Sequence, residues 1–100
     1  MFIHAVLFEI IPKEVSRYRK DCKMWVDYAR KANGFLGYFT MKRADYRNQY
    51  ASVYEWQSAG CHKRFMKKYH DWLVGKSKAK VKVLGYYNLK AVDVIRGDSL

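Results

Sequence analysis

The histidines and serines of this chain are the side chains best suited to acid–base or nucleophilic chemistry, and their spacing matches no hydrolytic site. His4 lies near the start, while His62 and His70 lie in the second half. A hydrolytic serine needs a histidine and an acid arranged with it, and the sequence places no such pair with Ser16, Ser52, Ser58 or Ser77. We therefore identify no Ser-His-Asp triad.

The two cysteines, Cys22 and Cys61, also form no recognisable site. They make no C-x-x-C pair, and their spacing to the histidines fits no zinc site. The glycines form neither a P-loop nor a dinucleotide-binding pattern. Both thiols are most simply small residues of the core or its boundary. The sequence thus predicts no metal and no bound cofactor.

Composition indicates one small basic domain. The chain has 100 residues, half of them hydrophobic and 17% aromatic, with a net charge of +11. This charge favours anionic partners such as nucleic acid, acidic lipid or a ligand carrying carboxylates or phosphates, although a solvated basic surface explains it equally well. A domain of this length is modestly stable alone, so dimerisation would help. The sequence runs from Met1 straight into a strand pattern without an apolar leader, which favours the cytoplasm.

The first half of the chain predicts a strand, a helix and a turn. Phe2–Ile11 is almost wholly apolar, as in a strand that is covered on both faces. Pro12 stands where a helix would begin, and an apolar stripe at steps of three and four predicts a helix of roughly twenty residues. Asn33-Gly34 supplies the stop. The stripe consists of Val15, Tyr18, Cys22, Trp25 and Ala29.

The middle of the chain predicts a hairpin and a second helix. Phe35–Arg43 and Asn48–Trp56 read as strands joined by the polar turn Ala44–Arg47. Ser58 is a good N-cap for the helix that follows. The stripe of that helix consists of Phe65, Met66, Tyr69, Trp72 and Leu73.

The C-terminal part has two interpretations. Lys76–Val83 is either a basic loop with a last helical turn or the start of one long strand bulged at Gly85, and strand length favours the loop. Tyr86–Ile95 reads as the final strand, which closes a single domain spanning residues 1–95. Arg96–Leu100 reads as a polar tail.

This order of elements predicts an α+β fold, the ferredoxin-like βαββαβ arrangement with a four-stranded antiparallel sheet and both helices on one face. The other face should be polar in a monomer, yet both sides of the first and third strands are apolar. A second copy of the same sheet is the simplest cover for that face.

From Phe2 to about Val94 the chain resembles the antibiotic biosynthesis monooxygenase family. The resemblance rests on the small size, the apolar first strand, Phe35-Leu36-Gly37 after the Asn-Gly stop, and Trp56-Gln57-Ser58 at the crossover. It implies a homodimeric α+β barrel with a pocket in each subunit between sheet and helices. It also implies oxidation of aromatic substrates without metal or flavin, in which the substrate supplies the electrons to oxygen.

Such a reaction needs a site that excludes water, orients a ring and stabilises a developing anion. Candidates are Trp56, which matches the crossover position of the family, and His62, Asn88 and Tyr86, with His4 on the first strand. Each has a structural alternative. Trp56 reads as a core anchor, His62 as a boundary residue of its helix and Asn88 as a residue on a wet strand edge. One ring of the Tyr86-Tyr87 pair must lie in the core or an interface, and His70 reads as solvated.

Three other functions remain open. The heme-degrading branch of the family carries an Asn on its first strand, and this chain has none among Met1–Ile10. An RNA-recognition motif shares the order of elements, and Tyr50–Glu55 echoes its stacking strand, but Ser52 occupies the place of one aromatic. A dimeric barrel that binds a small molecule without chemistry fits the sequence as well as an oxygenase does.

Overall fold

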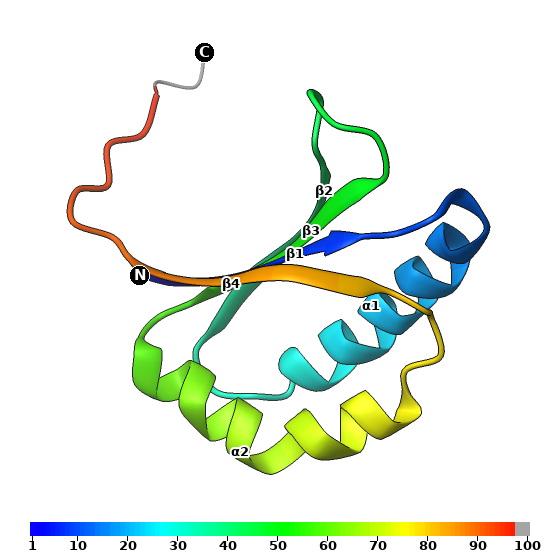
Figure 1. The fold of residues 1–100 in the computed structure, drawn as a ribbon. Coiled ribbons are helices and arrows are strands. Elements are labelled where there is room, and N and C mark those ends of the chain that lie inside the picture. The colour runs from blue at the N-terminus through cyan, green and yellow to red at the C-terminus, as the bar shows by residue number, and fades with distance from the viewer. Residues whose placement is uncertain (98–100) are drawn as a thin grey trace.

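The computed structural model describes residues 1–97 and shows a four-stranded antiparallel sheet with two helices on one face (Figure 1). The strands are β1 (Phe2–Glu9), β2 (Phe35–Lys42), β3 (Gln49–Trp56) and β4 (Lys82–Lys90), and the helices are α1 (Val15–Ala29) and α2 (Ala59–Lys76). The order across the sheet is β2-β3-β1-β4. The predicted ferredoxin-like α+β fold is thus confirmed.

Local sequence explains where the helices begin and how closely they approach the sheet. The Ser58 hydroxyl accepts a hydrogen bond from the Cys61 backbone N–H at 3.3 Å, as predicted for an N-cap. Gly34 has φ +86°, and a Cβ at this position would collide with the Cys61 side chain. Glycine is therefore required both by the backbone conformation and by the packing of α2.

The first strand and helix differ from the prediction at their junction. β1 ends at Glu9, and Pro12–Glu14 form a short 3-10 helix before α1 begins at Val15. The last ladder partner of β1 toward that end is Gln49, the first residue of β3, so Ile10 and Ile11 lie beyond the regular ladder. Pro12 opens a helical turn as expected, but it is a turn of the 3-10 type.

The predicted position of the last strand along the sequence is wrong. The loop from Ser77 to Val81 is confirmed, but β4 occupies Lys82–Lys90 instead of Tyr86–Ile95. It must end at Lys90, because Lys90 pairs with Phe2, the first residue of its partner β1. Gly85 lies inside the strand, next to a register shift. Of the polar tail predicted at 96–100, residues 98–100 lie outside the described part of the chain.

The helical side of the sheet carries two packed clusters. One surrounds the fully buried Trp56 and Leu73, where β3 meets α2. The other joins Ile10 to Tyr18 and Cys22 of α1. The space between these clusters positions the candidate site described below.

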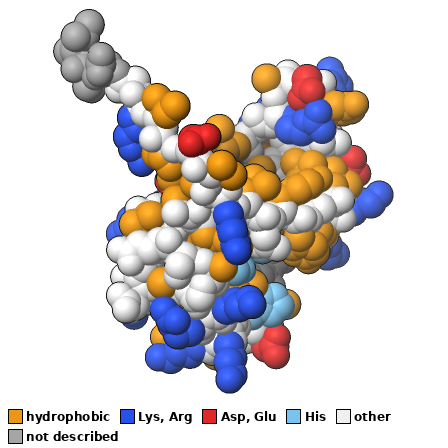
Figure 2. Space-filling model, turned by 90° about the vertical axis from the view of Figure 1, so that its left-hand side faces the viewer, with side chains coloured by type: hydrophobic (Ala, Val, Ile, Leu, Met, Phe, Trp, Pro, Cys, Tyr) orange, Lys and Arg blue, Asp and Glu red, His pale blue; other side chains and the backbone are white. Residues whose placement is uncertain are grey.

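The outer face of the sheet is apolar and open, as the sequence predicted. Phe39 and Met41 of β2 are about half exposed, and so are Tyr87 and Leu89 of β4. Figure 2 shows hydrophobic side chains gathered over the sheet below the C-terminal segment, whereas Lys and Arg side chains gather over the helical layer. Much of the positive charge in this view therefore lies over the helical layer.

The first and last strands lie side by side, β1 inside the sheet and β4 at its edge. The Ala91 backbone N–H donates a hydrogen bond to the Met1 carbonyl at 2.9 Å, just beyond the β1–β4 ladder.

Within residues 1–97, neither helix is long and apolar enough to cross a membrane.

Candidate functional site

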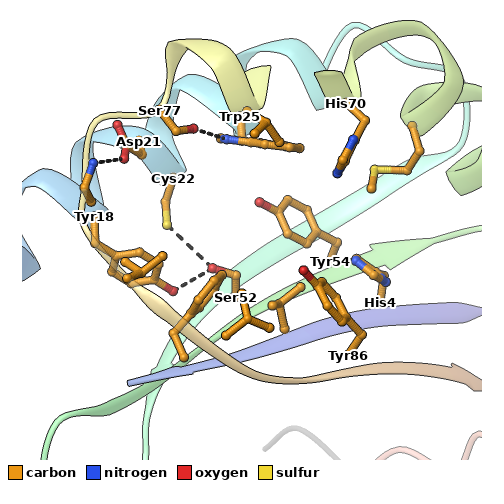
Figure 3. Close-up of a pocket in the computed structure, with 17 residues that line it drawn as sticks. His4, Tyr18, Asp21, Cys22, Trp25, Ser52, Tyr54, His70, Ser77 and Tyr86 are labelled. Carbon is orange, nitrogen blue, oxygen red and sulfur yellow. Dashed lines mark hydrogen bonds between the residues drawn. The ribbon is translucent and has the colours of Figure 1, made fainter. Parts of the chain in front are cut away.

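A cavity of about 340 Å³ lies between the sheet and the two helices (Figure 3). Its wall is mostly apolar and aromatic, with a few polar groups, which is the usual character of a small-molecule site. Strands, helices and the loop between α2 and β4 all contribute. The lining residues are His4, Val6, Phe8, Tyr18, Asp21, Cys22, Trp25, Ser52, Tyr54, Met66, His70, Val74, Ser77, Ala79, Val81, Val83 and Tyr86.

Sheet register sets the polar groups of the floor. His4 of β1 pairs with Tyr54 of β3, and Val6 pairs with Ser52. Because side chains alternate along a strand, His4 and Tyr54 form one row on the covered face, and Ser52 lies in the next row about 7 Å away. The cavity thus has two groups of polar side chains, one at His4 and Tyr54 and one around Ser52.

The imidazole of His4 is held by Asn88, its partner on β4. His4 Nδ1 lies 2.7 Å from the Asn88 side-chain oxygen. Since that oxygen accepts, Nδ1 carries the proton and Nε2 keeps a lone pair. Burial lowers the pKa of His4, the Asn88 bond opposes this, and His70 lowers it further. At neutral pH His4 is therefore a neutral imidazole that can accept a proton.

His62 of α2 lies against His4, with ring centroids 4.3 Å apart. Burial, together with the charge of His4, lowers the pKa of His62 to about 4. Its Nδ1 atom and the Trp56 indole N–H are both buried without a hydrogen-bond partner among residues 1–97. His62 is therefore neutral at neutral pH, and a positive charge on His4 would disfavour its protonation further.

Around Ser52 five side chains form a hydrogen-bonded network. The Ser52 hydroxyl lies 2.6 Å from the Tyr18 hydroxyl and accepts from the Tyr38 hydroxyl at 3.1 Å. Tyr38 in turn lies 2.7 Å from the Thr40 hydroxyl, and the Cys22 thiol lies 3.6 Å from Ser52. Burial raises the pKa of Tyr18, and burial with the nearby Cys22 raises the pKa of Tyr38 to about 12. These phenols therefore stay protonated at neutral pH.

Tyr54 differs from those tyrosines because its hydroxyl is not used within the cavity wall. Its side chain is only 9% exposed, and burial raises the pKa of its phenol well above the usual value. Figure 3 shows its oxygen directed into the cavity, with no hydrogen bond to the other residues drawn. A ligand oxygen beside it would satisfy this donor.

Helix α1 and the 3-10 helix before it hold the loop that closes one side of the cavity. The Asp21 carboxylate accepts hydrogen bonds from the Lys78 and Ala79 backbone N–H groups at 2.8–3.1 Å. The Glu14 carboxylate accepts from the Lys80 backbone N–H at 3.0 Å, and this bond lowers the pKa of Glu14. Trp25 donates its indole N–H to the Ser77 hydroxyl at 2.9 Å.

The predicted site residues fall into two groups. Tyr86 and His4 line the cavity, although Tyr86 is 65% exposed. Asn88 and His62 contact His4 but do not line the cavity. Trp56 lies in the core with 1% exposure. A direct role for Trp56 stays a prediction that the cavity geometry does not favour.

Several lining residues were not predicted from the sequence. The apolar stripe of α1 predicts core positions for Tyr18, Cys22 and Trp25, but all three line the cavity. The polar groups of these side chains could have indicated a cavity, since a filled core usually takes aliphatic residues at such positions. His70 was read as solvated; it bonds Asp71 at 3.0 Å and also borders the cavity.

Among known proteins, no family model and no curated protein matches this chain. Solved structures do. A variant of SnoaB, a cofactor-independent oxygenase from Streptomyces nogalater, superposes with a TM-score of 0.75 at 9% identity, covering 96% of this chain and 97% of SnoaB. The chain thus shares the fold of SnoaB. A putative antibiotic biosynthesis monooxygenase from Deinococcus radiodurans gives 0.69 at 13% identity, covering 99% of this chain and 100% of the other.

A third similar structure is MupZ from Pseudomonas fluorescens, with a TM-score of 0.72 at 13% identity over 87% of this chain and 69% of MupZ. Identities this low show a shared fold, so activity has to be argued from the cavity itself. The stacking surface expected for an RNA-recognition motif is not formed by Tyr50 and Tyr54, because Tyr50 packs against the Tyr18 cluster and Tyr54 is buried under the helices.

Proposed function

We propose that this protein is a cofactor-independent, monooxygenase-like enzyme that oxidises a small phenolic aromatic in the cavity between sheet and helices. The observation that carries the proposal is the buried, neutral His4, whose Nδ1 proton is fixed on Asn88. A neutral imidazole with one nitrogen held by a second residue is the usual arrangement of a general base. The fold shared with the oxygenase SnoaB supports the reaction class.

In the proposed reaction His4 Nε2 takes the proton of the phenol. The resulting phenolate is electron-rich and gives its electrons to dioxygen. One oxygen atom is bonded to the ring carbon opposite the phenolic oxygen, the hydrogen of that carbon is lost, and the other oxygen atom leaves as water. The ring becomes a para-quinone, so all four electrons that reduce dioxygen come from the substrate.

The remaining cavity residues have supporting roles in this proposal. The Tyr54 hydroxyl donates a hydrogen bond to the phenolate oxygen, whose charge increases as the proton leaves. The rings of Trp25 and Tyr86 border the substrate plane, and the apolar wall excludes water. His4 is the proposed catalytic residue, and Asn88 is a positioning residue that acts through it.

We also propose that the protein is a homodimer through the outer face of its sheet. Phe39, Met41, Tyr87 and Leu89 expose about half of their side chains there, and soluble monomers rarely expose so continuous an apolar surface. A second copy of the same face is complementary to it by symmetry.

The test is oxygen uptake with 1-naphthol as substrate, with the quinone product followed by absorbance. We expect His4→Ala to lower kcat by about 100-fold while 1-naphthol still binds. Asn88→Ala should lower kcat less and shift the pH profile, because the tautomer of His4 is no longer fixed. Asn33→Ala removes an exposed asparagine outside the cavity wall and should leave both unchanged.

Two outcomes would overturn the oxygenase proposal. Binding of 1-naphthol without oxygen uptake would make the protein a non-catalytic binding barrel. Absence of aromatic binding, together with micromolar binding of single-stranded RNA and a steep salt dependence, would favour the RNA-binding function.

A further inference from the structure

We propose that the cavity contains a covalent attachment site for quinones, with the Cys22 thiol as the nucleophile. The inference rests on the proposed function in one respect: oxidation of a phenol in this cavity would release a quinone beside that thiol. It can nevertheless be tested with added quinone alone, in the absence of any turnover.

Cys22 is a nucleophile for which the proposed oxidation has no use. It comes from α1, is only 6% exposed and still lines the cavity. Its Sγ atom lies 3.6 Å from the Ser52 hydroxyl oxygen, and Figure 3 shows it above the sheet between Tyr18 and Trp25. A ligand in the cavity therefore meets the thiol directly, whereas bulk solvent hardly reaches it.

An independent feature points to a ligand that carries oxygens. Tyr54 is about nine-tenths buried and directs a hydroxyl with no partner in the cavity wall into the space, and the buried His4 lies beside it. Ser52, which contacts Cys22, lies one row along β3, about 7 Å from Tyr54. A ring that places one oxygen at Tyr54 extends toward the thiol. A quinone has the required oxygens at opposite ends of a flat ring.

The reaction is an addition that needs no external oxidant. The sulfur bonds to a ring carbon of the quinone, and the electron pair of that carbon–carbon double bond moves through the ring to a carbonyl oxygen. The thiol proton passes to this oxygen through the neighbouring hydroxyls. The attacked carbon then loses its hydrogen as a proton to the second oxygen. The product is a hydroquinone bonded to Cys22 Sγ, so the quinone is reduced as the thioether forms.

The second cysteine, Cys61, makes it possible to distinguish labelling that is due to binding in the cavity from labelling that is due to general thiol reactivity. Cys61 lies in the first turn of α2, where the Ser58 hydroxyl and the Arg64 guanidinium both donate to its sulfur at 3.3 Å. Positive charge and a helix N-terminus normally favour a reactive thiol, so ordinary reactivity rules select Cys61. It packs against Gly34, however, and does not line the cavity. Selection of Cys22 would therefore be due to binding in the cavity.

The experiment is treatment of the folded protein with one equivalent of 1,4-naphthoquinone, followed by intact mass and peptide mapping. We expect a single adduct at Cys22, in the wild type and in Cys61→Ser, formed at least tenfold faster than any adduct in Cys22→Ala, because the bound ring is held beside the sulfur. In the absence of oxygen, where 1-naphthol cannot be oxidised to the quinone, an excess of 1-naphthol should slow the labelling of Cys22. In urea both cysteines should react alike.

Labelling of Cys61 before Cys22 in the folded wild type would overturn the proposal, as would labelling of Cys22 that 1-naphthol does not slow in the absence of oxygen. Both readouts use the unmodified sequence, so they hold even if a cysteine variant folds poorly. Oxygen uptake with 1-naphthol but no adduct at Cys22 would refute the attachment site alone. Specific labelling of Cys22 without oxygen uptake would refute the oxygenase alone.

Discussion

At the scale of single residues, the cavity depends on two histidines that are kept neutral. His4 is fixed by Asn88, and His62 lies against it with a pKa near 4. Neutral imidazoles in contact are compatible with a buried site, whereas two imidazolium ions are not, because burial removes the water that would stabilise them. Acid should therefore act on this pair before it acts on the carboxylates.

We predict that the protein loses stability as the pH falls from about 6.5 to about 4. In this range the unfolded chain binds a proton at residue 62, and the folded chain does not, so protonation favours unfolding. The loss due to His62 should be about 2 kcal/mol, after allowance for its partial exposure, and it should level off below pH 4. Urea unfolding at several pH values measures it.

His62→Phe should remove most of this loss between pH 6.5 and 4. His70→Gln is the matched control, because it removes only the smallest of the three contributions to the pKa of His4 and should keep most of the loss. An equal loss in the wild type and in His62→Phe would show that other groups are responsible.

At the scale of elements, the loop between α2 and β4 is the part of the cavity wall with the least secondary structure. Its inward residues Ser77, Ala79 and Val81 line the cavity, while the alternating lysines are exposed. Backbone hydrogen bonds to the Asp21 and Glu14 carboxylates of the first helical segment take the place of a ladder. The two acids also compensate part of the positive charge of the loop.

Replacement of Asp21 should release this loop. Asp21→Ala removes the acceptor of the Lys78 and Ala79 amides, and we expect a loss of about 2 kcal/mol in the free energy of unfolding. Hydrogen exchange at these two amides should become at least tenfold faster. Asp27→Ala makes the same substitution at an exposed position of α1 and controls for helix propensity. Similar exchange in both variants would argue against the fastening role.

The sequence predicts elements well where the cause is local. The Ser58 cap, the Gly34 stop and the β2–β3 hairpin follow from neighbouring residues, and together they give the correct fold. The bounds of β4 do not, because they depend on where its distant partner β1 begins. The residues of α1 that line the cavity could not be predicted for a similar reason. A stripe such as Tyr18, Cys22 and Trp25 shows which face of a helix is covered but not whether the covered space is filled.

At the scale of the whole molecule, charge and apolar surface lie on opposite sides of the sheet. The helical layer carries much of the +11 charge, and the outer sheet face carries half-exposed aromatic and aliphatic side chains (Figure 2). Charge repulsion therefore opposes association through the helices far more than association through the sheet.

A lysine on the outer face should prevent dimer formation. We predict that the wild type elutes from gel filtration with twice the 11.9 kDa mass of the chain, whereas Leu89→Lys elutes as a monomer. The reason is that an unpaired ammonium group would be buried at the interface. Gln57→Lys adds the same charge at an exposed position outside the outer face and should remain dimeric. A wild type of 11.9 kDa would contradict the proposed dimer.

The contact between Ala91 and Met1 has a consequence for how the chain can be rearranged. Since the end of β4 lies beside the start of β1, a short linker could join them, and new termini could be opened in the exposed turn between β2 and β3. The circularly permuted chain would run β3, α2, β4, β1, α1, β2. This is again strand, helix, strand, strand, helix, strand, so the permuted gene would encode the same architecture with its two halves exchanged.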